Sequence, residues 1–113
     1  MSYGKKTLED LRGPASELRR EIPEVYAGFS AELKAAMAPG ALDTKTKELM
    51  ALVIGVTQQC DGCIASHARA AARAGATKKE VAEALGVAIF MNGGPSTVYG
   101  PRAWEAFAEF STE

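Results

Sequence analysis

The balance between alanine and β-branched residues constrains the fold of this chain more than any other feature. The 113 residues include 21 alanines but only six valines and four isoleucines, and no long stretch alternates apolar with polar residues. Alanine has the highest intrinsic helix propensity, whereas an apolar-polar alternation with a period of two is typical of strands. We therefore expect an all-α fold, and the length fits a single domain that spans residues 1–113.

Start and stop signals divide the chain into six expected helices. Pro23 suits the first turn of a helix, Asp43 is a good N-cap, and Gly75 suits a C-terminal stop. Thr77 and Glu80 form a Thr-x-x-Glu capping box. The expected helices cover about residues 7–22, 23–37, 44–58, 61–74, 78–92 and 96–110. A break in the first helix and a kink in the last are expected at Gly13–Pro14 and Gly100–Pro101.

The fifth expected helix carries information about assembly. Residues 84–91 read Ala-Leu-Gly-Val-Ala-Ile-Phe-Met and are apolar on every face. A helix in a small monomer usually keeps one polar face, so we predict that another subunit covers part of this segment in a homo-oligomer. The alternative is a central helix wrapped entirely by its own chain.

Aromatic residues of the last helix are candidates for the wall of an apolar cavity, although core or interface packing is their commoner role: Tyr99, Trp104, Phe107 and Phe110.

Charge and targeting signals narrow the range of partners and compartments. The chain has 13 basic and 14 acidic side chains, with a formal net charge of -1. This balance gives no reason to expect a nucleic-acid or anionic-membrane partner. The sequence shows neither the apolar core of a signal peptide nor a run long enough to span a membrane, so we expect a cytoplasmic protein. In a reducing compartment, two closely spaced cysteines are expected to be reactive or metal-binding rather than a structural crosslink.

The segment from Cys60 to His67, which reads Cys-Asp-Gly-Cys-Ile-Ala-Ser-His, concentrates the reactive side chains. Residues three apart on a helix have Cβ atoms about 5–6 Å apart, and a modest adjustment, aided by the freedom of Gly62, would allow a disulfide. A cysteine in the first turn of a helix is favoured as a thiolate by the helix dipole. His67, the only histidine, lies four residues after Cys63 and is placed to take or share the thiol proton.

Other interpretations of the cysteine motif fit less well. Haem attachment requires a histidine directly after the second cysteine, where this chain has Ile64. A thioredoxin-type site belongs in a βαβ context, which this sequence lacks. Zinc requires four ligands, and the neighbourhood offers two cysteines, one histidine and at best Glu48. We therefore expect no metal and no cofactor.

Glu48 is the fourth candidate for the site. It precedes Cys60 by 12 residues, which is about 18 Å along a continuous helix, while His67 returns about 10 Å along the following helix. If the two helices fold back on each other, Glu48 and His67 come close enough to interact directly or through one water. On spacing alone, a solvated surface acid between Lys47 and Leu49 is the simpler interpretation of Glu48.

The wider pattern resembles a known family. Glu48, eleven residues, Cys60-x-x-Cys63, three residues and His67 resemble the signature of the AhpD-like alkylhydroperoxidases, within the carboxymuconolactone decarboxylase-like superfamily. The resemblance extends over about residues 42–94. Flanking residues that share it are Asp43, Lys45, Lys47 and Leu49 before the cysteines, and Ala68, Ala71, Gly75, Ala76, Thr77 and Glu80 after them.

The resemblance implies a function as well as a fold. It implies an all-α trimer or hexamer that reduces organic hydroperoxides through Cys60 and Cys63, with Glu48 and His67 as a proton relay. It also implies regeneration by an external dithiol or a lipoyl-bearing reductant protein. Some family peroxidases have a second histidine directly before the second cysteine, where this chain has Gly62. This departure bears on peroxidase activity more than on dithiol chemistry, and leaves another oxidant or a disulfide as substrates.

The expected mechanism has Cys63, paired with His67, attack the distal peroxide oxygen, after which Cys60 resolves the sulfenic acid as a disulfide. Cys60, nearer the helix start, is the alternative first nucleophile or the thiol that meets the reductant.

Two other functions remain open. One is a carboxymuconolactone decarboxylase-type lyase, which needs no redox cysteines. The other is a redox-sensing or zinc-binding module.

Overall fold

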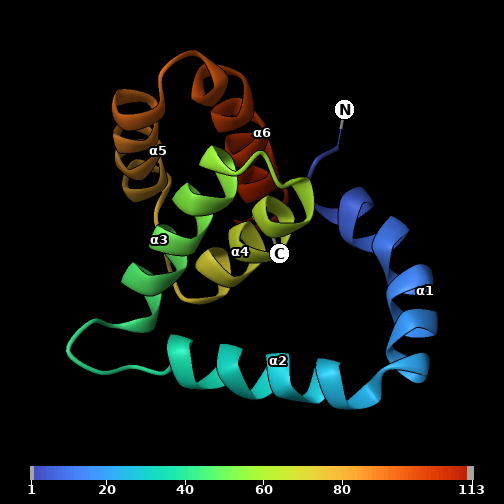
Figure 1. The fold of residues 1–113 in the computed structure, drawn as a ribbon. Helices are drawn as coiled ribbons and strands as arrows, with labels where there is room; N and C mark the ends of the chain where they lie inside the picture. The colour runs from blue at the N-terminus through green and yellow to red at the C-terminus, as the bar shows by residue number, and fades with distance from the viewer. Residues whose placement is uncertain (1, 112–113) are drawn as a thin grey trace.

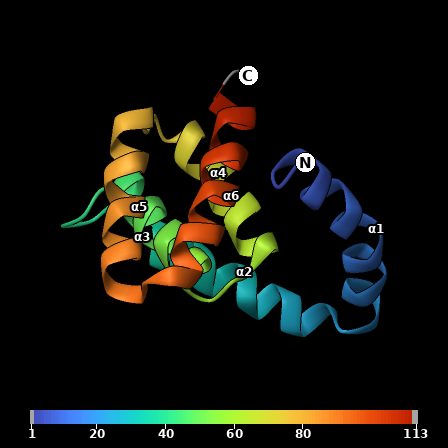
Figure 2. The ribbon, with the colours of Figure 1, turned by 90° about the horizontal axis from the view of Figure 1, so that it is seen from above.

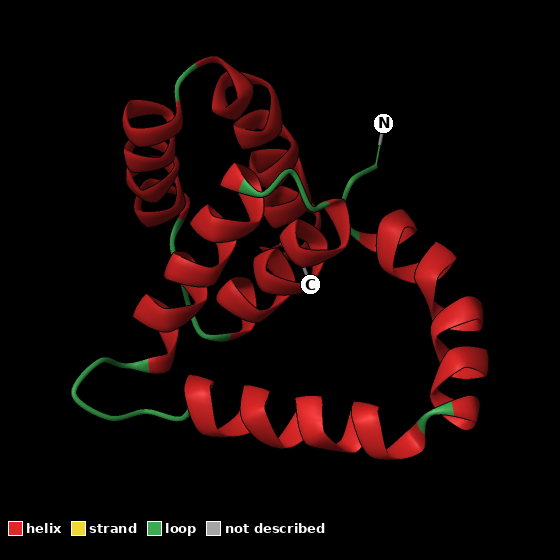
Figure 3. Cartoon of the chain, in the orientation of Figure 1, coloured by secondary structure: helices red, strands yellow, loops and turns green. Residues whose placement is uncertain are grey.

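The structure, a computed structural model, describes residues 2–111. Six helices and no strand occur among these residues, which confirms the all-α expectation (Figures 1 and 3). The helices are α1 (Lys5–Glu21), α2 (Pro23–Met37), α3 (Thr44–Thr57), α4 (Asp61–Arg73), α5 (Lys78–Asn92) and α6 (Gly94–Ser111).

Most helix boundaries follow from their local signals. Asp43 caps α3 by accepting the N–H of Thr46 at 2.7 Å. Thr77 and Glu80 make both hydrogen bonds of the capping box at the start of α5. Pro23 occupies the first turn of α2, where its missing N–H costs no helical hydrogen bond.

The break expected at Gly13–Pro14 is wrong, and the kink expected at Gly100–Pro101 does not interrupt α6. α1 continues through Pro14 and α6 continues through Pro101, and α6 already begins at Gly94, inside the expected turn. Both prolines are exposed, so each removes one N–H where water can satisfy the carbonyl left without its donor. α1 accordingly curves along its length without ending (Figure 1).

Helices α3 to α6 form the body of the molecule. α4 packs between α3 and α6, and α5 packs against α3 and α6 from the other side (Figures 1 and 2). Alanine lets these helices approach closely, which explains its abundance in the sequence. The core consists of Leu52, Val56, Ile64, Ala68, Ala71, Val81, Leu85, Ala88, Ala103, Ala106, Phe107 and Phe110. Of the four aromatic residues expected in the last helix, Phe107 and Phe110 are therefore core residues, whereas Trp104 is 41% exposed.

No helix within residues 2–111 has the length and apolarity needed to cross a bilayer.

Helices α1 and α2 form an arm that leaves this body. Neither helix contains a buried residue. α1 lies along α4, and among the described residues α2 packs against α1 and α3 (Figure 1). The start of the arm is fixed to α6, because Glu109 accepts the N–H groups of Gly4 and Lys5 and Glu105 accepts the N–H of Tyr3.

Candidate redox site at the start of helix α4

The turn between α3 and α4 fixes the position of the first cysteine. The N–H of Gln59 donates to the carbonyl of Val56 at 3.1 Å, and that of Cys60 donates to the carbonyl of Gly55 at 3.0 Å. These two bonds form a Schellman motif, with Gln59 in the left-handed conformation at a φ of 55°. Cys60 therefore ends the C-terminal motif of α3 and is also the N-cap of α4.

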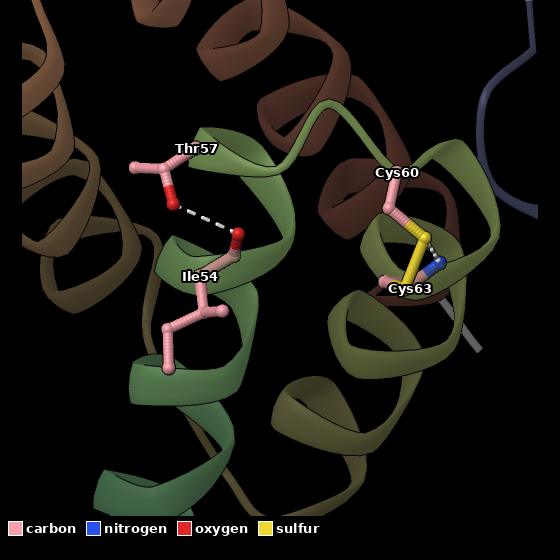
Figure 4. Close-up of a disulfide and its surroundings, with 4 residues drawn as sticks. All are labelled: Ile54, Thr57, Cys60 and Cys63. Carbon is pink, nitrogen blue, oxygen red and sulfur yellow. Dashed lines mark hydrogen bonds between the residues drawn. A yellow bond between two sulfur atoms is a disulfide. The ribbon is translucent and has the colours of Figure 1, made fainter.

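The two cysteines lie together at the N-terminus of α4. They are joined as a disulfide, with Cα atoms 5.2 Å apart, within the range that disulfides adopt (Figure 4). The N–H of Cys63 also donates to Sγ of Cys60 at 3.2 Å. Cys63 is exposed and Cys60 is half-buried, so a small molecule can reach the pair. After reduction, the N–H groups of this first turn would stabilise a thiolate.

Two glycines bring neighbouring helices against this turn. A Cβ on Gly55 would lie 3.3 Å from Cβ of Cys63, so the absence of a side chain lets α3 approach the site closely. A Cβ on Gly62 would lie 3.1 Å from Cδ1 of Leu11, so α1 covers this position. A histidine in place of Gly62 would have to displace Leu11. The contact of Gly55 was not identified from the sequence, where the only signal is a glycine inside an apolar helical stretch.

Glu48 and His67 meet directly. Oε1 of Glu48 and Nδ1 of His67 are 2.7 Å apart, because α3 and α4 cross where these side chains lie. Glu48 is only 7% exposed, which rules out the solvated surface acid that spacing alone favoured. A carboxylate at Nδ1 accepts the ring N–H and leaves Nε2 as the acceptor that can take another proton. Within the described part of the chain, His67 makes no side-chain hydrogen bond to either cysteine sulfur.

An open cavity of about 480 Å³ lies beside this pair. Its lining includes both acid-base side chains and two arginines of α4, and consists of Leu33, Thr44, Glu48, Ser66, His67, Arg69, Ala70, Arg73 and Ala74. The arginines bring positive charge to this lining, to which α2 contributes Leu33. The cavity gives a ligand access to His67 without passing through the core.

An ion pair also braces the first turn of α4 from α6. Nη1 of Arg102 lies 3.1 Å from both carboxylate oxygens of Asp61, the residue that follows Cys60. The guanidinium carbon lies 4.5 Å from the ring centre of Tyr3 and 4.3 Å from that of Tyr99. The hydrogen bond to Asp61 raises the pKa of Arg102 above its ordinary value. This pair could not be recognised from the sequence, because no local pattern connects residues 41 positions apart.

The side chains of residues 2–111 offer no group of three or more histidines, cysteines or acids arranged to hold a metal ion. A zinc site would therefore need the cysteine pair to open and Glu48 or another ligand to move toward it. The arrangement is suited instead to thiol-disulfide exchange with a nearby acid-base pair.

Comparison with known proteins shows the family to which this chain belongs. A family model described as the carboxymuconolactone decarboxylase family matches residues 23–109. An uncharacterized protein of Haemophilus influenzae is 42% identical over 104 residues, which are 92% of each chain. An uncharacterized protein of Cupriavidus necator is 33% identical over 105 residues, which are 87% of this chain and 93% of its own.

Solved structures of family members share the fold closely. A carboxymuconolactone decarboxylase family protein from Legionella pneumophila, in its apo form, has 46% identity and a TM-score of 0.88, covering 91% of this chain and 92% of its own. A family protein from Thermotoga maritima has 32% identity and a TM-score of 0.79, covering 96% and 92%. The family model matches most of the sequence, and these relatives align with nearly its whole length. The chain therefore belongs to the carboxymuconolactone decarboxylase family, within the AhpD-like superfamily.

Proposed function

We propose that this protein is a thiol-dependent oxidoreductase that reduces organic hydroperoxides by cycling Cys60 and Cys63 between dithiol and disulfide. The observation that carries the proposal is the bonded sulfur pair at the N-terminus of α4, with His67 further along the same helix and in contact with Glu48 of α3. The Thermotoga maritima relative has been suggested to take part in an antioxidative response. That description is consistent with the same chemistry here.

The first step consumes the hydroperoxide. His67 takes the proton of the Cys63 thiol, and the thiolate attacks the distal peroxide oxygen. The O–O bond breaks, Cys63 becomes a sulfenic acid, and the alkoxide leaves as an alcohol after it receives the proton. Glu48 holds the imidazole and stabilises its charged form. Since His67 and the sulfur are not hydrogen-bonded in the disulfide form, the proton transfer needs a small rotation or one water.

The second step closes the disulfide and the third reopens it. The thiol of Cys60 attacks the sulfur of the sulfenic acid, water leaves, and the disulfide forms. The N–H of Cys63, which donates to Sγ of Cys60, stabilises a thiolate on Cys60 whenever it is the resolving or leaving sulfur. An external dithiol, such as a lipoyl group on a partner protein, then supplies two electrons and two protons and is itself oxidised to a disulfide.

Counting free thiols tests the cycle. Reduced protein is mixed with one equivalent of an organic hydroperoxide, and thiols are titrated after denaturation. We expect two thiols lost per chain and multiple turnovers once a dithiol is supplied. The matched control replaces both Cys60 and Cys63 with serine and should consume no peroxide. If the wild-type protein keeps both thiols, the peroxidase proposal is wrong. If the thiols are lost but a dithiol supports no turnover, a redox-sensing module fits better.

Single substitutions assign the two cysteines. If Cys63 attacks, Cys60→Ser should trap a sulfenic acid that reacts with dimedone, and Cys63→Ser should form none. The reverse pattern would make Cys60 the first nucleophile, as its place at the N-cap allows. Mass spectrometry of the labelled protein distinguishes the two outcomes.

A decarboxylase reaction is the second candidate. The observation that favours it is the cavity beside Glu48 and His67, whose arginines, Arg69 and Arg73, offer the charge that a carboxylate substrate requires. Such a reaction needs acid-base groups but no sulfur. Decarboxylation of a carboxymuconolactone that survives replacement of both cysteines by serine would support this function over the redox cycle.

A further inference from the structure

A residue of α6 neutralises the acidic residue that lies between the two cysteines. Asp61 directly follows Cys60, and its carboxylate lies in the same helical turn as both sulfurs. A negative charge there destabilises a thiolate and opposes the favourable dipole of the helix N-terminus. Arg102 reaches this carboxylate from α6, with Nη1 at 3.1 Å from each oxygen. The pair therefore presents little net charge to the sulfurs.

Two tyrosine rings lie close to the guanidinium of Arg102. The rings of Tyr3 and Tyr99 lie 4.5 Å and 4.3 Å from its guanidinium carbon, one from the N-terminal segment and one from α6. Such stacking restricts a side chain that would otherwise sample many rotamers. Tyr3 is positioned in turn by the bond from its N–H to Glu105 at 3.2 Å. The N-terminal segment and α6 thus together keep one cation beside the first turn of α4.

We propose that Arg102 is a positioning residue of the redox site, which cancels the charge of Asp61 and holds the first turn of α4 so that the reduced cysteines remain reactive. This inference rests on the proposed thiol-disulfide function. Other charged groups lie on the helices packed against α4. The last turn of α3 carries no acidic or basic residue. On α1, Asp10 is paired with Lys6, and Arg12 is exposed. On α6, Glu105 accepts the N–H of Tyr3.

Thiol reactivity in charge variants tests the proposal directly. In Arg102→Gln the carboxylate of Asp61 loses its partner, so the pKa of the reactive thiol should rise by about 0.5–1 unit, the size expected for one partly solvated charge nearby. Asp61→Asn should shift it in the opposite direction. In the double variant Arg102→Gln/Asp61→Asn, the thiol pKa should return close to the wild-type value. In Arg102→Lys, which keeps the positive charge, the thiol pKa should stay close to that of the wild type. The readout is the pH dependence of alkylation by iodoacetamide in the reduced protein.

A second arginine that stacks on tyrosine provides the matched control. Arg19 lies 5.2 Å from the ring centre of Tyr26, on the arm. Arg19→Gln should leave the thiol pKa unchanged. Thermal unfolding of every variant shows whether a change in the thiol pKa comes from loss of the charge or from loss of the folded structure. A wild-type thiol pKa in folded Arg102→Gln, or a double variant that remains shifted like Arg102→Gln, would overturn the proposal. Because alkylation needs no peroxide, this test gives its answer even if the peroxidase cycle fails.

Discussion

At the scale of single residues, the contact between Glu48 and His67 distinguishes this site from a bare cysteine pair. A buried carboxylate needs a partner, and Nδ1 of His67 at 2.7 Å provides it. The contact fixes the orientation of the imidazole and directs Nε2 away from the carboxylate. The acid-base function proposed for His67 therefore depends on a residue that is contributed by a different helix.

Glu48→Gln should slow oxidation of the thiols by about 10- to 100-fold, below the full contribution of a general base, because the amide keeps the shape but cannot stabilise an imidazolium. The measurement is the second-order rate constant for reaction of the reduced protein with an organic hydroperoxide. Glu83→Gln, at an exposed position of α5, is the matched control and should react like the wild type. An unchanged rate in Glu48→Gln would remove Glu48 from the mechanism.

At the scale of the helices, capping places the reactive groups. Asp43 caps α3 five residues before Glu48, and the Schellman motif at the other end of α3 places Cys60 at the start of α4. The distance along α3 between these two ends is set by regular helix geometry. The functional side chains are therefore attached to rigid elements, which keeps their relative positions precise without a long loop.

The cap of α3 should show a pH dependence. The hydrogen bonds from Thr46 lower the pKa of Asp43 below its ordinary value of 3.8. The folded state therefore favours the carboxylate, and this contribution to stability is present above the ordinary pKa and lost as the pH falls through the lower folded value. In urea unfolding, the stability advantage of the wild type over Asp43→Asn should shrink between about pH 5 and about pH 2.

A comparison variant separates the charge of this cap from its hydrogen bond. Asp43→Ala loses the acceptor altogether and should be less stable than Asp43→Asn at every pH, because the N–H of Thr46 is then left to water. An advantage of the wild type over Asp43→Asn that stays constant down to the lowest pH would contradict the assignment.

At the scale of the whole molecule, several large apolar side chains are exposed on the described part of the chain. The exposed fraction is 84% for Phe90 and 74% for Met91 on α5, and 63% for Phe29 on α2. An apolar groove of about 380 Å³ between α3 and α5 adds to this surface. Exposed apolar surface is typical of protein–protein interfaces, and a homo-oligomer remains our prediction.

Phe90→Glu should weaken the assembly, because burial of a charge in an apolar interface is costly. Light scattering should give the wild type a mass that is a multiple of 11.9 kDa and the variant a shift toward a single chain. Lys79→Gln, at an exposed polar position of the same helix, changes the charge by the same amount and should leave the mass unaltered. A wild-type protein that scatters as one chain would contradict the prediction.

The sequence by itself determined the helices, their caps and the identity of the reactive residues. The capping box at Thr77 and the N-cap at Asp43 are local patterns, so they could be recognised without a fold. The cysteine pair could likewise be recognised, since residues three apart are close in any helical turn. The break at Pro14 was wrong because a single missing donor at an exposed position does not end a helix.

Only the tertiary structure decided how these parts meet. The crossing of α3 and α4 brought Glu48 to His67, an outcome that spacing along the chain left open. The same packing requires Gly55 beside Cys63, and it carries Arg102 from α6 to Asp61. Local patterns follow from hydrogen bonds within a few residues, whereas these contacts depend on crossing angles set by side-chain packing across the core.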